Sequence, residues 1–442
     1  MSNRVRTIIL GAAGRDFHNF NMVYRDDPAT EVVAFTGAQI PGISGRRYPA
    51  SLAGPLYPHG IPIEDEAHFE DLCRKLGASR VVFAYSDVTH ESVMHAASRS
   101  LAAGADFVLL GPASTYLEAT VPVVAVTAAR TGSGKSPLSR WIAGRIASHG
   151  RKVAVVRHPM PYGDLAAQAC QRFAAHADLD RYDCTIEERE EYEPHIDAGV
   201  VVYAGVDYER ILREAEQEAD VILWDGGNND LPFYVPDLHL VLVDPLRPGD
   251  ERRYHPGEAN VRMADVIIVN KCDEAIPENI ALVETSVREL NPAAEIIRCD
   301  SPVTLDQPEL VAGKRVVVVE DGPTLTHGSM TFGAGVVGAR GARVEAIVDP
   351  SGYAVGSLVD TYARYPNARG ILPAMGYSPA QVRDLQATLE AVDADAIVSG
   401  TPIDLRRVLT VRKPMVRAHY ELREQVPGRL DAALDRVLGA KC

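Results

Sequence analysis

Short apolar runs that end in Gly or Asp alternate along most of the chain with amphipathic segments of about 10 to 16 residues. Apolar runs of this length are typical of strands buried on both faces, and the amphipathic segments are typical of helices that cover them. The alternation is the βαβ rhythm of a mostly parallel sheet. The pattern therefore predicts an α/β fold.

The first block of the chain has the pattern of a Rossmann-like domain covering residues 1–120. We expect its strands and helices at the positions that follow: strands at 6–11, 30–37, 80–85 and 106–111, and helices near 66–77 and 89–103. A Pro- and Gly-rich stretch, "PGISGRRYPASLAGPLYPHGIP", interrupts the block. Because Pro and Gly break regular elements, we expect an exposed loop there.

A second block opens with the apolar run "VPVVAVTA" at 121–128. Six further strand candidates follow it: "RKVAVVRHP", "ADVILWDGG", "LHLVLVDP", "ADVIIVNKCD", "AEIIRCD" and "KRVVVVEDGP". We assign residues 121–442 to this second unit, with 326–442 as a C-terminal α/β extension that begins at a Gly-rich stretch. The pattern leaves open whether the extension continues the same sheet.

Composition narrows the class of partner. The 442 residues carry a net charge of −15, which disfavours nucleic acid because binding a phosphate backbone normally needs a basic face. The six cysteines form no CxxC pair, and no uninterrupted apolar stretch reaches the length of a membrane span. We therefore expect a cytoplasmic enzyme that acts on small molecules and binds neither nucleic acid nor a membrane. We also expect that it can form a homodimer.

The segment "AARTGSGKSPLSRW" at 128–141 has the context of a phosphate-binding P-loop: an apolar strand before it and an amphipathic helix after it. Backbone N–H groups of such a loop face the β-phosphate, its lysine reaches the β and γ oxygens, and its serine hydroxyl binds Mg²⁺. The nucleotide-binding residues of the loop are Thr131, Gly132, Ser133, Gly134, Lys135 and Ser136. Ala129 stands where the usual pattern opens with glycine. The sequence thus predicts a P-loop NTPase core.

Acidic residues at two strand ends are candidates for the metal. Asp225 ends "ADVILWDGG", and Glu320 and Asp321 end "KRVVVVEDGP". A carboxylate in such a place holds Mg²⁺ directly or through water, and the metal bridges the β and γ phosphates. We therefore take Ser136, Asp225 and Glu320 as the metal residues.

The segment "VIIVNKCDE" resembles the Asn-Lys-x-Asp signature of GTP-binding proteins, with Asn270, Lys271 and Asp273 in the matching places. In that signature the aspartate accepts two N–H groups from the guanine edge. Related ATP-dependent proteins have similar strand ends. From these residues the choice between ATP and GTP therefore stays open.

Polar clusters follow several strands. They are, in chain order, Arg157 and His158; Asn228, Asn229 and Asp230; and Thr324, Thr326 and His327. Ligands of open α/β sheets gather at the carboxyl ends of strands, so these loops should converge on one crevice beside the γ-phosphate. Single residues among them also suit ordinary turns. Together they predict a site for a phosphate acceptor.

The first strand leads into "LGAAGRDFHNFN", which has two glycines of the dinucleotide-binding pattern and lacks the third. The segment therefore suits an anionic substrate, delivered across a domain cleft, better than NAD. Its candidate substrate residues are Arg15, Asp16, His18 and Asn19. Arg46 and Arg47 in "GISGRR" could add charge from a mobile loop.

These motifs, with "RHPMPYGDL", "WDGGNNDLPF", "VDPLRPGDE", "EDGPTLTHG" and "ILPAMGY", resemble the cyclic 2,3-diphosphoglycerate synthetases and their relatives described as predicted GTPases, over residues 7 to about 410. The resemblance implies a Mg²⁺-dependent ligase that transfers the γ-phosphate of ATP to 2,3-diphosphoglycerate and closes an intramolecular phosphoanhydride. The residues it implies as catalytic are Lys135, Arg157, His158, Asp225 and Asp230. Arg157, His158, Arg15 and His18 would bind the phosphates of the acceptor, and Asp225 and Asp230 would order metal or water.

The acceptor stays open because the cyclic product is chiefly an osmolyte of heat-loving methanogens, whereas this chain is rich in Ala and Arg and poor in Lys. Another phosphorylated or carboxylated metabolite is the alternative. Two other classes of protein remain: a regulatory or metallochaperone-type GTPase, favoured by Asn270 to Asp273, and a Rossmann oxidoreductase, favoured by the "GAAG" turn alone.

Overall fold

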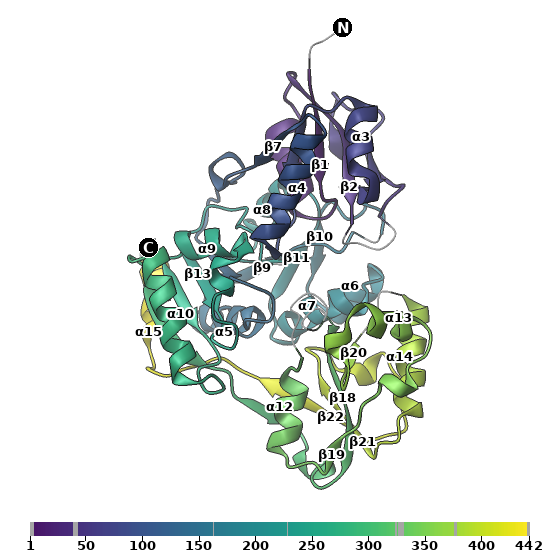
Figure 1. Ribbon diagram of the computed structural model, residues 1–442. Helices are drawn as coiled ribbons and strands as arrows, with labels where there is room; N and C mark the ends of the chain where they lie inside the picture. The colour runs from purple at the N-terminus through teal and green to yellow at the C-terminus, as the bar shows by residue number, and fades with distance from the viewer. Residues whose placement is uncertain are drawn as a thin grey trace.

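The computed structural model describes residues 4–38, 43–161, 163–227, 229–322, 325, 331–374 and 378–439. Three sheets organise these residues, and most of their strand pairs are parallel. Figure 1 shows the N-terminal sheet at the top, a central sheet below it, and a C-terminal sheet at the lower right. The predicted α/β class is confirmed.

The N-terminal sheet is parallel except at one edge, where β3 pairs antiparallel with β4. Its strands, in spatial order, are β3 (Arg47–Tyr48), β4 (Ile61–Asp65), β2 (Thr30–Gly37), β1 (Val5–Leu10), β5 (Arg80–Phe83) and β7 (Asp106–Leu109). Its helices are α1 (Arg15–Asn19), a π-helical turn η1 (Phe20–Tyr24), α2 (Ala50–Ala53), α3 (Phe69–Leu76) and α4 (His90–Ala102). The predicted strands and helices of this block coincide with β1, β2, β5, β7, α3 and α4.

The prediction of an exposed loop at the Pro- and Gly-rich stretch is confirmed only in part, because many of its described residues are exposed but several apolar ones are buried. Tyr48 and Ala53 are fully buried, and Tyr57 is 6% exposed. The Tyr48 ring stacks on Phe17 with 4.6 Å between the ring centroids. Apolar side chains spaced along the segment thus form one wall of the N-terminal core, although Pro and Gly keep its backbone irregular.

The central sheet holds the P-loop and is parallel except for the edge strands β10 and β23. Its strands, in spatial order, are β10 (Gln171–Phe173), β11 (Val201–Ala204), β9 (Val153–Arg157), β12 (Val221–Gly226), β8 (Val123–Ala128), β13 (Leu238–Val243), β15 (Val266–Val269), β16 (Glu295–Asp300) and β23 (Arg423–Glu424). Every residue of β8, β12 and β13 is buried. This double-sided burial explains why these strands read as unbroken apolar runs.

Helices cover the central sheet on both faces. They are α5 (Lys135–Ser148), α6 (His176–Arg181), α7 (Ile186–Asp197), α8 (Tyr208–Ala215), α9 (Gly257–Met263), α10 (Pro277–Leu290) and α15 (Arg429–Leu438). In α5, Leu138, Ile142 and Ile146 recur at helical spacing and are fully buried in the central core. This packing fixes the helix that starts at the end of the P-loop.

Residues 303–420 form the C-terminal sheet, which is separate from the central one. Its strands are β17 (Val303–Leu305), β22 (Met415–Tyr420), β21 (Ala396–Gly400), β18 (Arg315–Asp321) and β19 (Ala346–Ile347), with β20 (Leu372–Ala374) paired to β18. Its helices are α12 (Ala334–Gly341), α13 (Ser357–Arg364) and α14 (Pro379–Ala391). The prediction that "KRVVVVEDGP" joins the sheet of the P-loop is wrong, because β18 lies at the centre of this third sheet.

The chain returns to the central sheet at its end. Strand β23 pairs with β16, and Leu430, Leu434 and Leu438 of α15 are buried in the central core. A short antiparallel ribbon of β6 (Val88–Thr89) and β14 (Tyr254–His255) joins the N-terminal and central units. Within the described ranges, no helix is both long enough and apolar enough to span a membrane.

Candidate active site

The P-loop connects β8 to α5 with the geometry that a phosphate loop needs. Gly132 and Gly134 adopt the left-handed region, with φ of 83° and 101°, which glycine reaches without a steric penalty. Gly134 directly precedes the first residue of the helix, Lys135. The loop therefore turns its backbone into the positive end of a 14-residue helix.

Ala129 fits the place of the usual opening glycine because its backbone is not left-handed. Its N–H donates to the carbonyl of Leu242 over 2.8 Å, and its side chain is buried among apolar neighbours of β13. The close approach that excludes a side chain lies at Gly257 instead, where a Cβ would overlap the Ala129 carbonyl oxygen. Glycine is therefore needed at Gly257, at the start of α9, and not at position 129.

Lys135 and Asp225 form the centre of the site. Nζ of Lys135 donates to the Asp225 carbonyl at 2.7 Å and to its Oδ1 at 2.8 Å, and the Ser139 hydroxyl donates to the same Oδ1 at 2.9 Å. Burial alone would raise the pKa of Asp225, but Arg157 and Lys135 outweigh it and hold that pKa well below its usual range. Burial lowers the pKa of Lys135 to about 8. Asp225 is thus an ionised carboxylate that holds the Lys135 ammonium and the Arg157 guanidinium in position.

Arg157 is the second cation of this cluster. Its guanidinium, 4% exposed at the residue level, pairs with Asp225 and also with Glu191 of α7. His195, also on α7, lies with Nε2 at 3.7 Å from Oδ2 of Asp225. The carboxylates of Asp225 and Glu191 balance the charges of Lys135 and Arg157, so two cations are held in fixed positions beside the P-loop, which suits a site for phosphoryl oxygens.

Asn270 and Lys271 brace the P-loop from β15. Nδ2 of Asn270 donates to the Ser133 carbonyl at 3.0 Å. Nζ of Lys271 donates to the Gly132 carbonyl at 2.6 Å and to Asp244 at 2.9 Å. Oδ1 of Asp273 accepts the Ser301 N–H at 2.9 Å. These contacts hold the loop's shape, and the choice between ATP and GTP stays a prediction.

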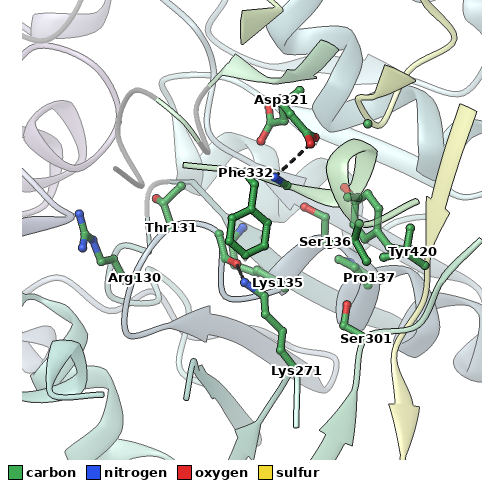
Figure 2. A pocket seen from close by; sticks show the side chains of 18 of the residues that line it. Arg130, Thr131, Lys135, Ser136, Pro137, Lys271, Ser301, Asp321, Phe332 and Tyr420 are labelled. Atoms are coloured by element: carbon green, nitrogen blue, oxygen red, sulfur yellow. Dashed lines mark hydrogen bonds between the residues drawn. The ribbon is translucent and has the colours of Figure 1, made fainter. Parts of the chain in front are cut away.

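The C-terminal sheet closes the site from the other side. A cavity of about 200 Å³ lies between the P-loop and this sheet, and Phe332, Glu320, Asp321 and Tyr420 line it together with the loop. Figure 2 shows Phe332 and Tyr420 around the same space as Lys135, Ser136 and Lys271. Sequence reasoning missed the roles of Phe332, Tyr420 and Glu191 because no local motif marks residues that only the packing of two sheets brings together.

Glu320 serves as the cap of α12. Its carboxylate accepts the backbone N–H groups of Gly333, Gly335 and Val336 at 2.8 to 3.1 Å. Burial raises the pKa of Glu320 to about 7, although these three N–H donors partly offset that rise. Both oxygens are thus engaged at a helix N-terminus. The metal role predicted for Glu320, Ser136 and Asp225 stays a prediction; Ser136 lines the cavity, and the Asp225 carboxylate is paired with Lys135 and Arg157.

Arg15 and Asp16 line a second cavity, together with His158 and Asp230. Nε2 of His158 lies 3.3 Å from Oδ2 of Asp230, and Nδ1 forms a 2.7 Å hydrogen bond with the Tyr208 hydroxyl. Burial lowers the pKa of His158, so the ring is neutral at neutral pH. The second cavity lies on the carboxyl side of β1, between the N-terminal and central units.

The described polar loops therefore divide between two cavities, and the prediction of one crevice is wrong for them. Asn229 and Arg157 line the P-loop cavity, while the residues that follow each, Asp230 and His158, line the second. The reason is local. Arg157 is the last residue of β9, so its side chain and that of His158 point to opposite sides of the backbone, whereas Asn229 has a left-handed backbone, with φ of 53°, in the turn after β12.

Three further groups of predicted substrate residues do not line either cavity among the described residues. His18 stacks on Phe233 at a centroid distance of 4.0 Å and contacts the Thr115 carbonyl at 2.6 Å through Nε2, and Asn19 is 1% exposed. Both side chains are packed inside the protein and do not line the second cavity. Arg46 and Arg47 bind backbone carbonyls of neighbouring loops. The remaining predicted residues, Asn228, Thr324, Thr326 and His327, lie outside the described residues.

Comparison with known proteins assigns the family. No family model matches the chain. The chain is 59% identical over 430 residues to arginine synthetase ArcE of Thermococcus kodakarensis, covering 97% of this chain and 96% of that protein. The chain belongs to the arginine synthetase ArcE family. This membership and the P-loop make it an enzyme of the nucleotide-dependent ligase or kinase type.

Two further likenesses are more distant than the ArcE family. Cyclic 2,3-diphosphoglycerate synthetase of the same organism is 31% identical over 77 residues, which is 17% of this chain and 18% of that one. The LpxK structure from Aquifex aeolicus in complex with ATP has a TM-score of 0.44 at 12% identity, covering 73% of this chain and 90% of that one. The predicted resemblance to the cyclic 2,3-diphosphoglycerate synthetases is therefore confirmed only in part. One segment of 77 residues is similar to such an enzyme, and the chain as a whole belongs to the ArcE family.

Proposed function

We propose that the protein is an ATP-dependent arginine synthetase. The observation that carries the proposal is the buried cluster of Lys135, Asp225 and Arg157 at a P-loop, in a chain 59% identical to ArcE over nearly its whole length. A P-loop of this type serves transfer of the γ-phosphoryl group. Arginine must then be made from a substrate that such a transfer activates.

Chemistry identifies that substrate as a ureido amino acid. The guanidinium of arginine differs from the ureido group of citrulline in that a nitrogen replaces the carbonyl oxygen. The ureido oxygen is a poor leaving group until it bears a phosphoryl group. It would attack the γ-phosphorus of ATP, releasing ADP, and ammonia would then add to the same carbon and displace inorganic phosphate. Citrulline, ATP and ammonia thus give arginine, ADP and phosphate, and every atom is accounted for.

The cluster supplies what the phosphoryl transfer needs. Lys135 and Arg157 neutralise the charge on the transferring group, and Asp225 holds both cations in place before the nucleotide arrives. Phe332 and Tyr420 cover the cavity from the C-terminal sheet. Exclusion of water there protects the activated ureido group from hydrolysis.

Magnesium fits the same place. Ser136 lines the cavity, and Asp225 is an ionised, buried carboxylate beside the loop lysine. In the part of the chain that the structure describes, no group of three or more His, Cys, Asp or Glu side chains is placed to hold a metal. Mg²⁺ usually takes one or two protein ligands, nucleotide phosphates and water, so two residues suffice. When bound it would neutralise negative charge on the nucleotide phosphates.

A second candidate is the cyclic 2,3-diphosphoglycerate synthetase reaction, which the 77-residue likeness favours. It uses the same nucleotide chemistry, and its acceptor is a phosphorylated acid instead of a ureido group. A GTPase that turns over without acceptor is the third possibility, favoured by Asn270 to Asp273. Cytoplasmic location and a homodimer stay predictions for all three.

One assay separates these functions. The purified protein is incubated with Mg²⁺ and ATP or GTP, and with citrulline plus ammonium, with 2,3-diphosphoglycerate, or with no acceptor. Phosphorus NMR follows the nucleotide, and mass spectrometry with ¹⁵N-ammonium follows arginine. We expect ATP loss that requires citrulline and ammonium and yields arginine one mass unit heavier. Turnover with 2,3-diphosphoglycerate alone, or GTP loss without acceptor, would replace the proposal.

Substitution of the loop lysine provides the control. Lys135→Ala should lower turnover by roughly 100- to 1,000-fold, as removal of one preorganised charge-stabilising group does. Lys152→Ala is matched, because Lys152 is an exposed lysine of the same sheet at the start of β9. It should leave turnover unchanged. Equal activity of the two variants would contradict the assignment of the P-loop cavity as the reaction site.

A further inference from the structure

The second cavity holds a buried cation without a full set of partners. Arg15 is 6% exposed, its Nε lies 3.9 Å from Oδ1 of Asp230, and its Nη2 contacts the Leu110 carbonyl at 3.5 Å. No described residue accepts a hydrogen bond from its Nη1. A buried charged donor without an acceptor is costly, so this guanidinium is suited to an anionic ligand group in the cavity that it lines.

The same cavity also has carboxylates suited to a cation. Oδ1 of Asp16 accepts the Ala13 and Phe17 N–H groups, and burial raises the pKa of Asp16 to about 7. Asp230 accepts the Leu231 N–H and lies beside neutral His158. Asp16 forms no ion pair with the adjacent Arg15 among the described contacts. A cationic ligand group would lower the cost of keeping the Asp16 carboxylate ionised.

Size and position limit the ligand. The cavity has about 60 Å³ of free space, which is room for about four water-sized groups. That is close to the size of an ammonium and a carboxylate on one carbon. His158 and Asp230 on its wall each follow directly a residue of the P-loop cavity, Arg157 and Asn229. The Cα atoms of neighbouring residues are about 3.8 Å apart, so the two cavities lie on opposite sides of the same two short segments.

We propose that this second cavity binds the head group of an α-amino acid, with Arg15 receiving the carboxylate and Asp16 and Asp230 receiving the ammonium. The reactive end of the amino acid then points to the nucleotide. The identification of that amino acid as citrulline rests on the proposed function, whereas the recognition of a zwitterionic head group does not.

His158 sets the boundary between the cavities. A Cβ at Gly14 would lie 2.8 Å from its Cδ2, and a Cβ at Gly227 would lie 2.9 Å from its Cβ. The two glycines, one from each unit, thus let the imidazole pack between them. His158 therefore fills the space between the two units, and its Nε2 lies 3.3 Å from Oδ2 of Asp230 on the wall of the second cavity.

The test compares citrulline with two analogues that each lack half of the head group. (4-Aminobutyl)urea lacks the carboxylate, and 5-ureidopentanoate lacks the ammonium. Calorimetry on the full chain with Mg²⁺ and ADP should show each analogue binding about 10- to 100-fold more weakly than citrulline, the range for a lost charge-assisted hydrogen bond. Wild-type affinities within threefold of one another would overturn the proposal.

Two variants assign the halves. Arg15→Gln should bind citrulline and (4-aminobutyl)urea with affinities within about threefold and still discriminate against 5-ureidopentanoate, and Asp16→Asn should show the reverse. Arg74→Gln is the matched control, because Arg74 is an exposed arginine of the same unit that pairs with Asp71. ADP affinity, unchanged in all three variants, reports an intact fold. Undiminished discrimination in Arg15→Gln would overturn the proposal.

Orthophosphate and two other amino acids complete the design. If orthophosphate displaces citrulline and this competition vanishes in Arg15→Gln, the cavity is a simple anion site and the amino-acid assignment fails. If arginine or ornithine binds with the same discrimination but citrulline is never converted, the proposed function fails and this inference stands. If citrulline is converted without head-group discrimination, the inference fails and the proposed function stands.

Discussion

Lys135 should set the alkaline limit of nucleotide binding. Burial lowers its pKa to about 8 in the free protein, despite the attraction of Asp225. Nucleotide phosphates favour the charged lysine and raise that pKa in the complex. Below pH 8 the lysine is therefore ready to bind, and above pH 8 binding must take up a proton. The apparent dissociation constant should rise about twofold at pH 8 and about 11-fold at pH 9, or about 1.4 kcal/mol.

Calorimetric titration with Mg²⁺ and ADP between about pH 7 and pH 9 measures this effect. Two buffers of different ionisation heat give the proton uptake, which should approach one per nucleotide at pH 9. Lys135→Arg is the control, because arginine stays charged throughout this range and should show little pH dependence. A wild-type affinity constant to within twofold from pH 7 to pH 9, or the same rise in Lys135→Arg, would refute the reasoning.

Three further substitutions test the architecture around the loop. Gly257→Ala should lower the free energy of unfolding in urea by about 1–3 kcal/mol and weaken ATP binding, because the new Cβ overlaps the Ala129 carbonyl. Gly144→Ala is the control, because its Cβ meets open space on α5, and it should be neutral or stabilising. Equal effects of the two substitutions would contradict the packing. Ala129→Gly should change ADP affinity by less than about twofold, since that backbone needs no glycine; a clear gain in affinity would show that alanine impairs the loop. Glu320→Gln tests the cap of α12. Burial raises the pKa of Glu320 from 4.5 to about 7, so the folded state keeps a proton that the unfolded chain loses, and stability falls by about 1.4 kcal/mol per pH unit between those values. Urea unfolding of the variant should be less pH-dependent by that amount, and an unchanged slope would contradict the assignment.

The nucleotide half of the site was predictable from sequence because its signals are local. A strand, a Gly-rich turn, Lys135 and an amphipathic helix follow one another without a gap, and Asp225 lies near the end of a buried strand, where it contacts Lys135. Each element depends on near neighbours and on a well-known backbone geometry. The structure adds that Ala129 is compatible with this geometry because its backbone is not left-handed.

The rest depended on contacts that no local pattern encodes. Phe332 and Tyr420 reach the cavity only because a separate C-terminal sheet packs against the loop. Glu191 lies in the acidic stretch "EEREEYE", which reads as a solvated helix face until Arg157 is seen beside it. At the N-terminus the sequence could not tell that Arg15 lines a cavity while His18 stacks on Phe233, because both lie in one turn of helix and differ only in direction.

The most direct test of the central claim follows the ureido oxygen. Citrulline labelled with ¹⁸O in the ureido group is incubated with the protein, Mg²⁺, ATP and ammonium, and the inorganic phosphate is analysed by phosphorus NMR and mass spectrometry. If the γ-phosphoryl group is transferred to the ureido oxygen and displaced by ammonia, each phosphate released carries one ¹⁸O and appears in step with arginine. Unlabelled phosphate, or phosphate released without arginine, would contradict the account.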